Sequence, residues 1–184
     1  MAIFQNERDT SNIITPHMNI SVSGTDFINA ARSSIDDICA ADCKMNNGQI
    51  IIIVAIYISP NQPIKDILIF LKRILWAYTI KGSQELDVDF YQRPMIIAGD
   101  FNTEFNYDRG KQIIHYFQTQ LGLCMNNNPN VGTTRYGTTI DAVFSRNLND
   151  MASQVFATYF SYHKPIISVV PKSNSNALAV ETFE

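Results

Sequence analysis

The chain has 184 residues, of which 46% are hydrophobic and 17% are charged, and its formal net charge at pH 7 is −3. This length and composition predict one globular domain with a sizeable core, and the acidic balance argues against a general nucleic-acid coat protein. We expect the domain to occupy residues 1–172 and a polar tail to follow at 173–184.

No segment has the pattern of a membrane span or a secretory signal. The Ile-rich stretch 50–58 is too short to cross a bilayer, and the N-terminus lacks a basic segment followed by an apolar core. Cys39, Cys43 and Cys124 form no CxxC pair and no zinc-type spacing with histidine. We therefore expect an intracellular protein, nuclear or cytoplasmic, with reduced core cysteines and no membrane partner.

The first half of the chain changes from strand signals to a helix signal. Residues 35–44 predict a short strand, 46–48 (Asn-Asn-Gly) a turn, and the β-branched run 50–58 a central strand, so that the two strands form a hairpin. After Pro63 the apolar spacing becomes 3.6 residues. This spacing predicts one amphipathic helix that ends near Gly82, followed by a polar connection over 83–93.

The second half begins with an apolar strand at 94–98 and a helix from Asp108 to Leu121 that Gly122 ends. A loop at 126–130 and three short strands near 138–145, 154–160 and 165–171 follow. Strands that alternate with helices and then pair locally predict an α/β fold with mixed sheets.

The tetrapeptide Gly99-Asp100-Phe101-Asn102 closes the strand at 94–98. An apolar run that ends in Gly is typical of a buried strand that delivers the next residues to a sheet edge. On extended backbone Asp100 and Asn102 project to the same face, where they could accept a proton from a water molecule and hold it. A plain turn is the alternative, because Gly, Asp and Asn all favour turns.

Two further residues are candidates for the same chemistry. Asp141 is a lone carboxylate in an apolar strand, and it needs a partner or a cleft unless that strand is an edge strand facing solvent. His163 lies just before the last apolar strand, and a carboxylate that orients a histidine also favours its protonated form. We expect Asp141 within hydrogen-bond reach of His163, in a cleft shared with Asp100 and Asn102.

The charge is uneven along the chain. Residues 1–106 hold 8 basic and 12 acidic side chains, whereas residues 107–172 hold 6 basic and 3 acidic ones. The basic excess is compatible with a phosphate-bearing substrate, and a solvated surface is the alternative. The six basic residues are Arg109, Lys111, Arg135, Arg146, Lys164 and Lys172.

This ordered set of motifs resembles the endonuclease/exonuclease/phosphatase superfamily, which includes exonuclease III-like AP endonucleases, DNase I and retroelement endonucleases. The resemblance covers about residues 50–170 and comprises Tyr57 in the segment 55–60, the Gly-Asp-Phe-Asn motif, Asp141 in its strand and the Ser-x-His-x-Pro motif at 161–165. It implies a DNase I-like sandwich of mixed β-sheets flanked by helices. The segment 138–141 (Thr-Thr-Ile-Asp) looks most like endonuclease domains carried by mobile elements.

The resemblance implies a metal-dependent hydrolysis of phosphodiesters, with DNA or another phosphodiester as the partner. Asp100 would accept the proton of the attacking water, and Asn102 would orient that water. Asp141 would hold His163, which would stabilise the pentacovalent phosphate. Tyr57 would lie near the scissile phosphate. Mg²⁺, or Mn²⁺, would complete the site, with Asp100 as a weak ligand.

The chain also departs from the family pattern. Family members begin with a strand that carries an Asn and a strand that ends in a metal-holding Glu, and nothing before Ile50 matches either. Residues 1–4 resemble the strand that follows that Glu, so we expect an N-terminally truncated fold, with Glu7 as a possible substitute ligand. Tyr162 stands where the family has Asp, and a phenol does not replace a carboxylate as a ligand at neutral pH.

These departures leave two other functions open. The chain could be a catalytically inactive family member that is kept as an interaction module or remains as a remnant of a mobile element. It could also be a phosphatase that acts on small molecules or lipids with the same residues. The sequence defines no oligomeric state.

Overall fold

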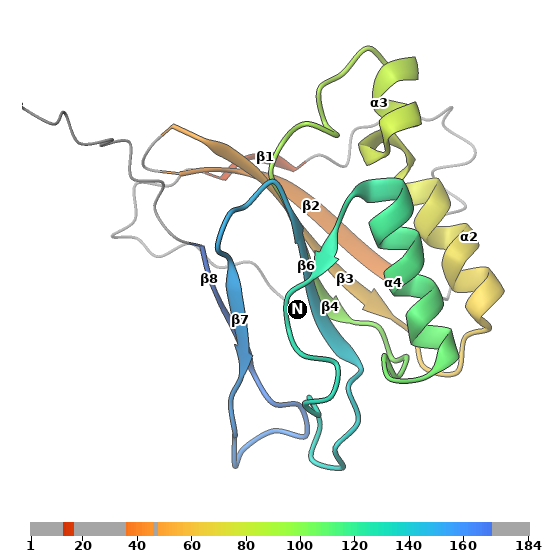
Figure 1. Ribbon diagram of the computed structural model, residues 1–184, viewed down its shortest axis with the longest axis vertical. Helices are drawn as coiled ribbons and strands as arrows, with labels where there is room; N and C mark the ends of the chain where they lie inside the picture. Colours follow the sequence, from red (N-terminus) through yellow and green to blue (C-terminus); the bar gives the residue numbers. More distant parts are fainter. Residues whose placement is uncertain (1–12, 17–35, 46–47, 171–184) are drawn as a thin grey trace, which may run out of the picture.

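The structure is a computed structural model that describes residues 13–16, 36–45 and 48–170. A six-stranded mixed sheet, in the order β1-β2-β3-β4-β6-β5, has helices on one side and a two-stranded sheet, β7–β8, on the other (Figure 1). The strands are β1 (Ile13–Pro16), β2 (Asp36–Lys44), β3 (Ile50–Ile58), β4 (Met95–Asp100), β5 (Cys124–Met125), β6 (Asp141–Arg146), β7 (Ala152–Val155) and β8 (Ile166–Val169). The helical elements are α2 (Ile64–Ile74), the 3₁₀ turn η1 (Trp76–Tyr78), α3 (Ile80–Glu85) and α4 (Asp108–Leu121).

The predicted mixed α/β architecture is confirmed. β2 and β3 form an antiparallel hairpin, β3 and β4 are parallel with α2 in the crossover between them, and β4 pairs antiparallel with β6. The predicted central strand 50–58 and the predicted helix 108–121 have the bounds that the structure gives them. Gly122, with φ of 65°, ends α4 in the left-handed conformation that favours glycine.

The prediction of one helix from Pro63 to Gly82 is wrong. α2 ends at Ile74, and a new short helix, α3, begins after Thr79, whose Oγ1 accepts a hydrogen bond from the Gly82 backbone N–H at 3.0 Å. Gly82 lies inside α3, where a Cβ would lie 1.9 Å from the Trp76 carbonyl oxygen. Gly82 therefore permits a close contact between α3 and η1 instead of ending a helix.

The last three strands are shorter than predicted or displaced. Residues 138–140 precede β6 and belong to a turn in which the Thr133 N–H donates to the Thr138 carbonyl and Gly137 has φ of 83°. The two-residue strand β5 was not predicted. Residues 1–4, Glu7, Asn46, Asn47 and the tail 173–184 lie outside the described residues.

The core lies between the large sheet and the helices α2 and α4. Four phenylalanines at its centre, each at most 1% exposed, meet largely edge to face. Ring centroids lie 4.7 Å apart for Phe117 and Phe144, the closest pair among them. The other two rings are Phe101 and Phe105, from the segment directly after β4, so the core anchors the chain that leads away from Asp100.

The three cysteines are free, and Cys43 is buried. Cys39 and Cys124 are exposed, so the expectation of core cysteines is wrong for these two. In the part of the chain that the structure describes, the helices are too short or too polar to cross a membrane.

Gly99 determines how closely β3 and β4 approach at the end of the sheet. A Cβ on Gly99 would lie 1.8 Å from the Ile56 carbonyl oxygen and 2.7 Å from Ile56 Cγ2. Any larger residue therefore forces the two strands apart next to Asp100.

We expect Gly99→Ala to lower the free energy of unfolding by about 2–3 kcal/mol, because the added methyl overlaps backbone atoms that cannot rotate away. Urea denaturation followed by circular dichroism measures this. Gly48→Ala is the comparison, since its Cβ meets nothing within 4 Å and its φ of 84° alone costs about 1 kcal/mol. Equal losses in the two variants would contradict the account of the β3–β4 contact.

Candidate functional site

Three neighbouring strands place three of the predicted site residues in one row. Tyr57 of β3 pairs in register with Asp100 of β4, and Asp100 pairs with Asp141 of β6. Residues in register on adjacent strands present their side chains on the same face of a sheet. Asp100 is the last residue of β4 and Asp141 the first of β6, so the row lies where the sheet ends.

His163 joins this row from the connection between β7 and β8. Its Nδ1 lies 3.0 Å from Asp141 Oδ2 and 3.2 Å from Asp141 Oδ1, and its Nε2 lies 3.8 Å from Asp100 Oδ2. The expected hydrogen bond between Asp141 and His163 is therefore present. The imidazole lies between two carboxylates, bound to one and facing the other. We call Tyr57, Asp100, Asp141 and His163 the strand-end site.

Asn102 is close to Asp100 but not in the arrangement that the sequence predicts. Its φ of 45° places it in the left-handed region, so the expectation of extended backbone through Asn102 is wrong. Its backbone N–H donates to Asp100 Oδ1 at 2.9 Å, and its side-chain amide donates to the Ile58 carbonyl at 2.8 Å. Asn102 thus ties the ends of β3 and β4 together and fixes the Asp100 carboxylate.

Burial raises the pKa of the Asp100 carboxyl above its usual range. The hydrogen bond from the Asn102 N–H opposes this rise, the negative charge of Asp141 adds to it, and His163 opposes it. The balance is a carboxylate that holds a proton more readily than an ordinary aspartate, which suits a residue that accepts a proton from water.

Two buried polar residues for which the sequence predicts no role hold the start of β6. Thr133 Oγ1 accepts hydrogen bonds from the backbone N–H groups of Ile140 and Asp141, both at 3.1 Å. Asn127 Oδ1 accepts from the Val143 N–H at 2.8 Å, and its amide donates to the Asp141 carbonyl at 3.3 Å. Thr133 is fully buried and Asn127 is 2% exposed, so buried hydrogen-bond partners hold the backbone of Asp141.

Part of the predicted basic excess is used within the fold. The Arg146 guanidinium is buried and donates to the carbonyls of Tyr78, Leu121 and Phe90 at 2.7–2.9 Å, so Arg146 is not a phosphate ligand. Arg109 donates to the Gln62 carbonyl. Lys172 lies outside the described residues.

Two basic residues remain next to His163. Lys164 follows it in sequence, and Nζ of Lys164 donates to the Gly132 carbonyl at 3.1 Å. Arg135 donates from its side chain to carbonyls of the loop that carries His163. Because a carbonyl group is neutral, these hydrogen bonds do not neutralise the positive charges of Arg135 and Lys164.

Asp100, Asp141 and His163 form a group that could hold a metal ion, since one ligand atom from each lies within 4.8 Å of the others. Both Asp141 oxygens face His163 Nδ1, and Asp100 Oδ1 accepts from Asn102, so Asp100 Oδ2 is the oxygen best placed for a hard cation. The group fits a metal that takes most of its ligands from water and substrate.

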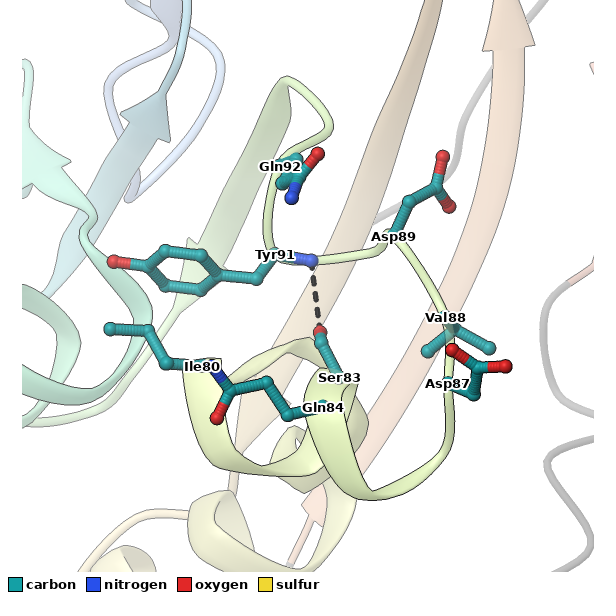
Figure 2. A pocket seen from close by; sticks show the side chains of 8 residues that line it. All are labelled: Ile80, Ser83, Gln84, Asp87, Val88, Asp89, Tyr91 and Gln92. Atoms are coloured by element: carbon teal, nitrogen blue, oxygen red, sulfur yellow. Dashed lines mark hydrogen bonds between the residues drawn. The ribbon is translucent and has the colours of Figure 1, made fainter.

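A separate pocket of about 480 Å³ lies between α3 and the segment that leads to β4 (Figure 2). Its buried hydroxyl, Ser83 Oγ, accepts from the Tyr91 N–H at 3.0 Å and donates to the Ala77 carbonyl at 2.9 Å. These bonds leave Ser83 no free proton for a ligand. The pocket contains none of the residues of the strand-end site.

No protein-family model and no curated protein matches the sequence. Solved structures do match. An endonuclease/exonuclease/phosphatase from Beutenbergia cavernae has a TM-score of 0.51 at 16% identity, over 72% of this chain and 38% of that one. A beta toxin from Staphylococcus aureus has a TM-score of 0.53 at 11% identity, over 74% of this chain and 57% of that one. A conserved protein of unknown function from Enterococcus faecalis has a TM-score of 0.52 at 14% identity, over 73% and 56% of the two chains.

At these identities the likeness shows the fold. The chain has the fold of endonuclease/exonuclease/phosphatase structures, which confirms the predicted DNase I-like α/β architecture with mixed sheets and flanking helices. The match spans about half the length of the solved structures that the chain resembles.

We expect Asp100→Asn to raise the melting temperature at pH 7 in metal-free buffer. The raised pKa means that the ionised Asp100 destabilises the folded state, whereas Asn is neutral and keeps an Oδ1 for the Asn102 N–H. The difference in melting temperature should shrink as the pH falls through the raised pKa of Asp100, because the wild-type carboxyl then protonates. Differential scanning calorimetry measures this, with the exposed Asp150→Asn as a variant expected to change little. A lower melting temperature for Asp100→Asn would contradict the account.

Thr133→Val should lower the free energy of unfolding by about 1–3 kcal/mol, because the partly buried backbone N–H groups of Ile140 and Asp141 lose the fully buried hydroxyl that accepts from them. Thr133→Ser keeps the hydroxyl and is expected to lose less. Chemical denaturation of both variants measures the difference. An equal loss would mean that the methyl group, and not the hydroxyl, stabilises the start of β6.

Proposed function

Because the chain has the fold of endonuclease/exonuclease/phosphatase structures, we propose that it hydrolyses phosphodiester bonds at the strand-end site. The observation that carries this proposal is the position of the His163 imidazole, which is bound to Asp141 through Nδ1 and faces Asp100 through Nε2. A histidine oriented by one carboxylate beside a second, partly buried carboxylate supplies an acid and a base at one point.

Each residue then has a distinct role. The Asp100 carboxylate accepts a proton from a water molecule, whose oxygen forms a bond to phosphorus while the bond from phosphorus to one ester oxygen breaks. That ester oxygen leaves as an alkoxide and takes a proton from solvent water. Asp141 fixes the imidazole ring so that protonated His163 donates through Nε2 to the phosphate and stabilises the added negative charge. Tyr57, in register with Asp100 and 39% exposed, lies at the same strand ends, where its hydroxyl can reach a phosphate oxygen.

A divalent cation, Mg²⁺ or Mn²⁺, fits this chemistry. Asp100 would hold it together with water and phosphate oxygens, and the cation would neutralise charge on the phosphate. A single carboxylate anchor among the described residues predicts weak binding and a need for high metal concentrations.

We propose DNA as the substrate. The order of the four motifs, which resembles endonucleases of this superfamily, supports this choice, as do Arg135 and Lys164 beside His163, because phosphodiester backbones attract such charges.

Purified protein incubated with supercoiled plasmid and Mg²⁺ or Mn²⁺ should convert it to the nicked form. Asp100→Ala and His163→Ala should each reduce the rate about 10²- to 10⁴-fold, because each removes a proton-transfer or charge-stabilising group. His115→Ala is the matched control, since His115 is exposed on α4 and belongs to no part of the site. Agarose gel densitometry measures the rates, and chelation of the metal should abolish nicking.

Two outcomes would contradict this function. Equal nicking by wild type and both site variants would show that the activity does not come from this site. Folded protein that nicks no plasmid at any metal concentration, and hydrolyses neither nucleotides nor inositol phosphates, would indicate an inactive interaction module.

A further inference from the structure

Four aromatic side chains lie exposed on two loops beside the strand-end site. Tyr136 is 83% exposed, Tyr159 89%, Phe160 98% and Tyr162 44%. We call them the aromatic rim. Tyr136 belongs to the loop before β6, and the other three belong to the connection between β7 and β8; both loops extend beyond the same end of the sheet (Figure 1). Exposed aromatic rings on adjoining loops are typical of a binding surface.

Hydrogen bonds join the two loops to each other, and three of them come from Arg135. Its backbone N–H donates to the Tyr162 carbonyl at 3.0 Å. Its side chain donates through Nε to the Ser161 carbonyl at 3.1 Å and through a terminal nitrogen to the Tyr159 carbonyl at 3.0 Å. The rim therefore sits on backbone that is held in place, which lowers the cost of ordering it on binding.

The rim continues directly from the histidine of the site. The Tyr162 ring meets the His163 ring at 5.1 Å with an interplanar angle of 73°, and Tyr136 meets Tyr162 at 5.6 Å and 58°. Tyr162 stands where the family has Asp, so it supplies no carboxylate to a metal ion. Its contacts show a ring packed between His163 and Tyr136, so the series of rings leads outward from the place where the phosphate would lie.

We propose that the aromatic rim stacks the unpaired bases of a single-stranded nucleic acid whose phosphate lies at His163. This inference rests on the proposed phosphodiester hydrolysis and names the form of its substrate. Unpaired bases offer both faces to aromatic side chains, whereas the bases of a duplex already stack on each other. The guanidinium of Arg135 and the ammonium of Lys164 lie on the same two loops, and their charge complements a phosphate backbone and not an apolar protein partner.

The test measures binding without cleavage. A fluorescent single-stranded 12-mer with 2-aminopurine at its centre, and the same sequence as a duplex, are titrated with protein in EDTA. We expect the single strand to bind about 10-fold more tightly than the duplex and its 2-aminopurine fluorescence to be quenched. Tyr136→Ala and Phe160→Ala should each weaken single-strand binding about 5- to 100-fold and reduce quenching.

The matched control is Tyr136→Phe, which keeps the ring and removes only the hydroxyl, and it should retain both affinity and quenching. The dependence of affinity on salt should stay the same in Tyr136→Ala, because no charge is removed. Circular dichroism of each variant verifies the fold. Loss of binding in Tyr136→Phe would overturn stacking in favour of a hydrogen bond from the hydroxyl.

Three other results would overturn the proposal. The first is equal affinity for single strand and duplex, and the second is unchanged binding in both alanine variants. The third is a wild-type dimer that Phe160→Ala dissociates in sedimentation, which would assign the rim to a protein contact. Because binding is measured in EDTA, ring-dependent binding by a protein that cleaves neither plasmid nor the single-stranded 12-mer in Mg²⁺ or Mn²⁺ would refute the hydrolysis alone. Plasmid nicking without ring-dependent binding would refute the rim alone.

Discussion

The register of three central strands is the constraint on which the rest of the site depends. β3, β4 and β6 align Tyr57, Asp100 and Asp141 in one row. A slip of one residue in either pairing would turn a side chain of the row to the opposite face of the sheet. Gly99 sustains this register because the missing Cβ lets β4 lie against the Ile56 carbonyl, one residue before the row. A hydrophobic sheet thus delivers two carboxylates to its end at a fixed spacing.

The loops around the row of Tyr57, Asp100 and Asp141 supply the hydrogen bonds that hold the two carboxylates, and they supply His163. The tetrapeptide that ends at Asn102 comprises the end of β4 and a bend at Asn102, and it also carries a candidate catalytic group, so the two interpretations of its sequence are not alternatives. The bend supplies the N–H that holds the Asp100 carboxylate, while Thr133 and Asn127 hold the backbone of Asp141. His163 then enters from the β7–β8 connection. The site is therefore positioned mostly by backbone hydrogen bonds and not by contacts between charged groups.

The sequence predicts those parts of the structure where one local signal dominates. The β-branched run 50–58 and the helix 108–121 have strong periodicity and clear ends, and both have the predicted bounds. The break after α2 escaped prediction because it depends on the Thr79 cap and on the close contact of Gly82 with Trp76, which are not visible in a 3.6-residue pattern. Thr133 and Asn127 escaped because uncharged polar residues in a loop-like stretch look solvated until the fold buries them. Charge counting misjudged Arg146 for the same reason, since its carbonyl partners come from three distant segments.

The central claim is that Asp100 and His163 act as one unit on a phosphodiester. A kinetic double-mutant cycle with bis(p-nitrophenyl) phosphate and Mn²⁺ tests it most directly, with Asp100→Ala, His163→Ala and the double variant compared under single-turnover conditions. Residues that act together in one step are strongly non-additive, so the account predicts a double variant about as slow as the slower single variant. Rate losses that add in free energy would contradict it, because they would show two groups that act independently.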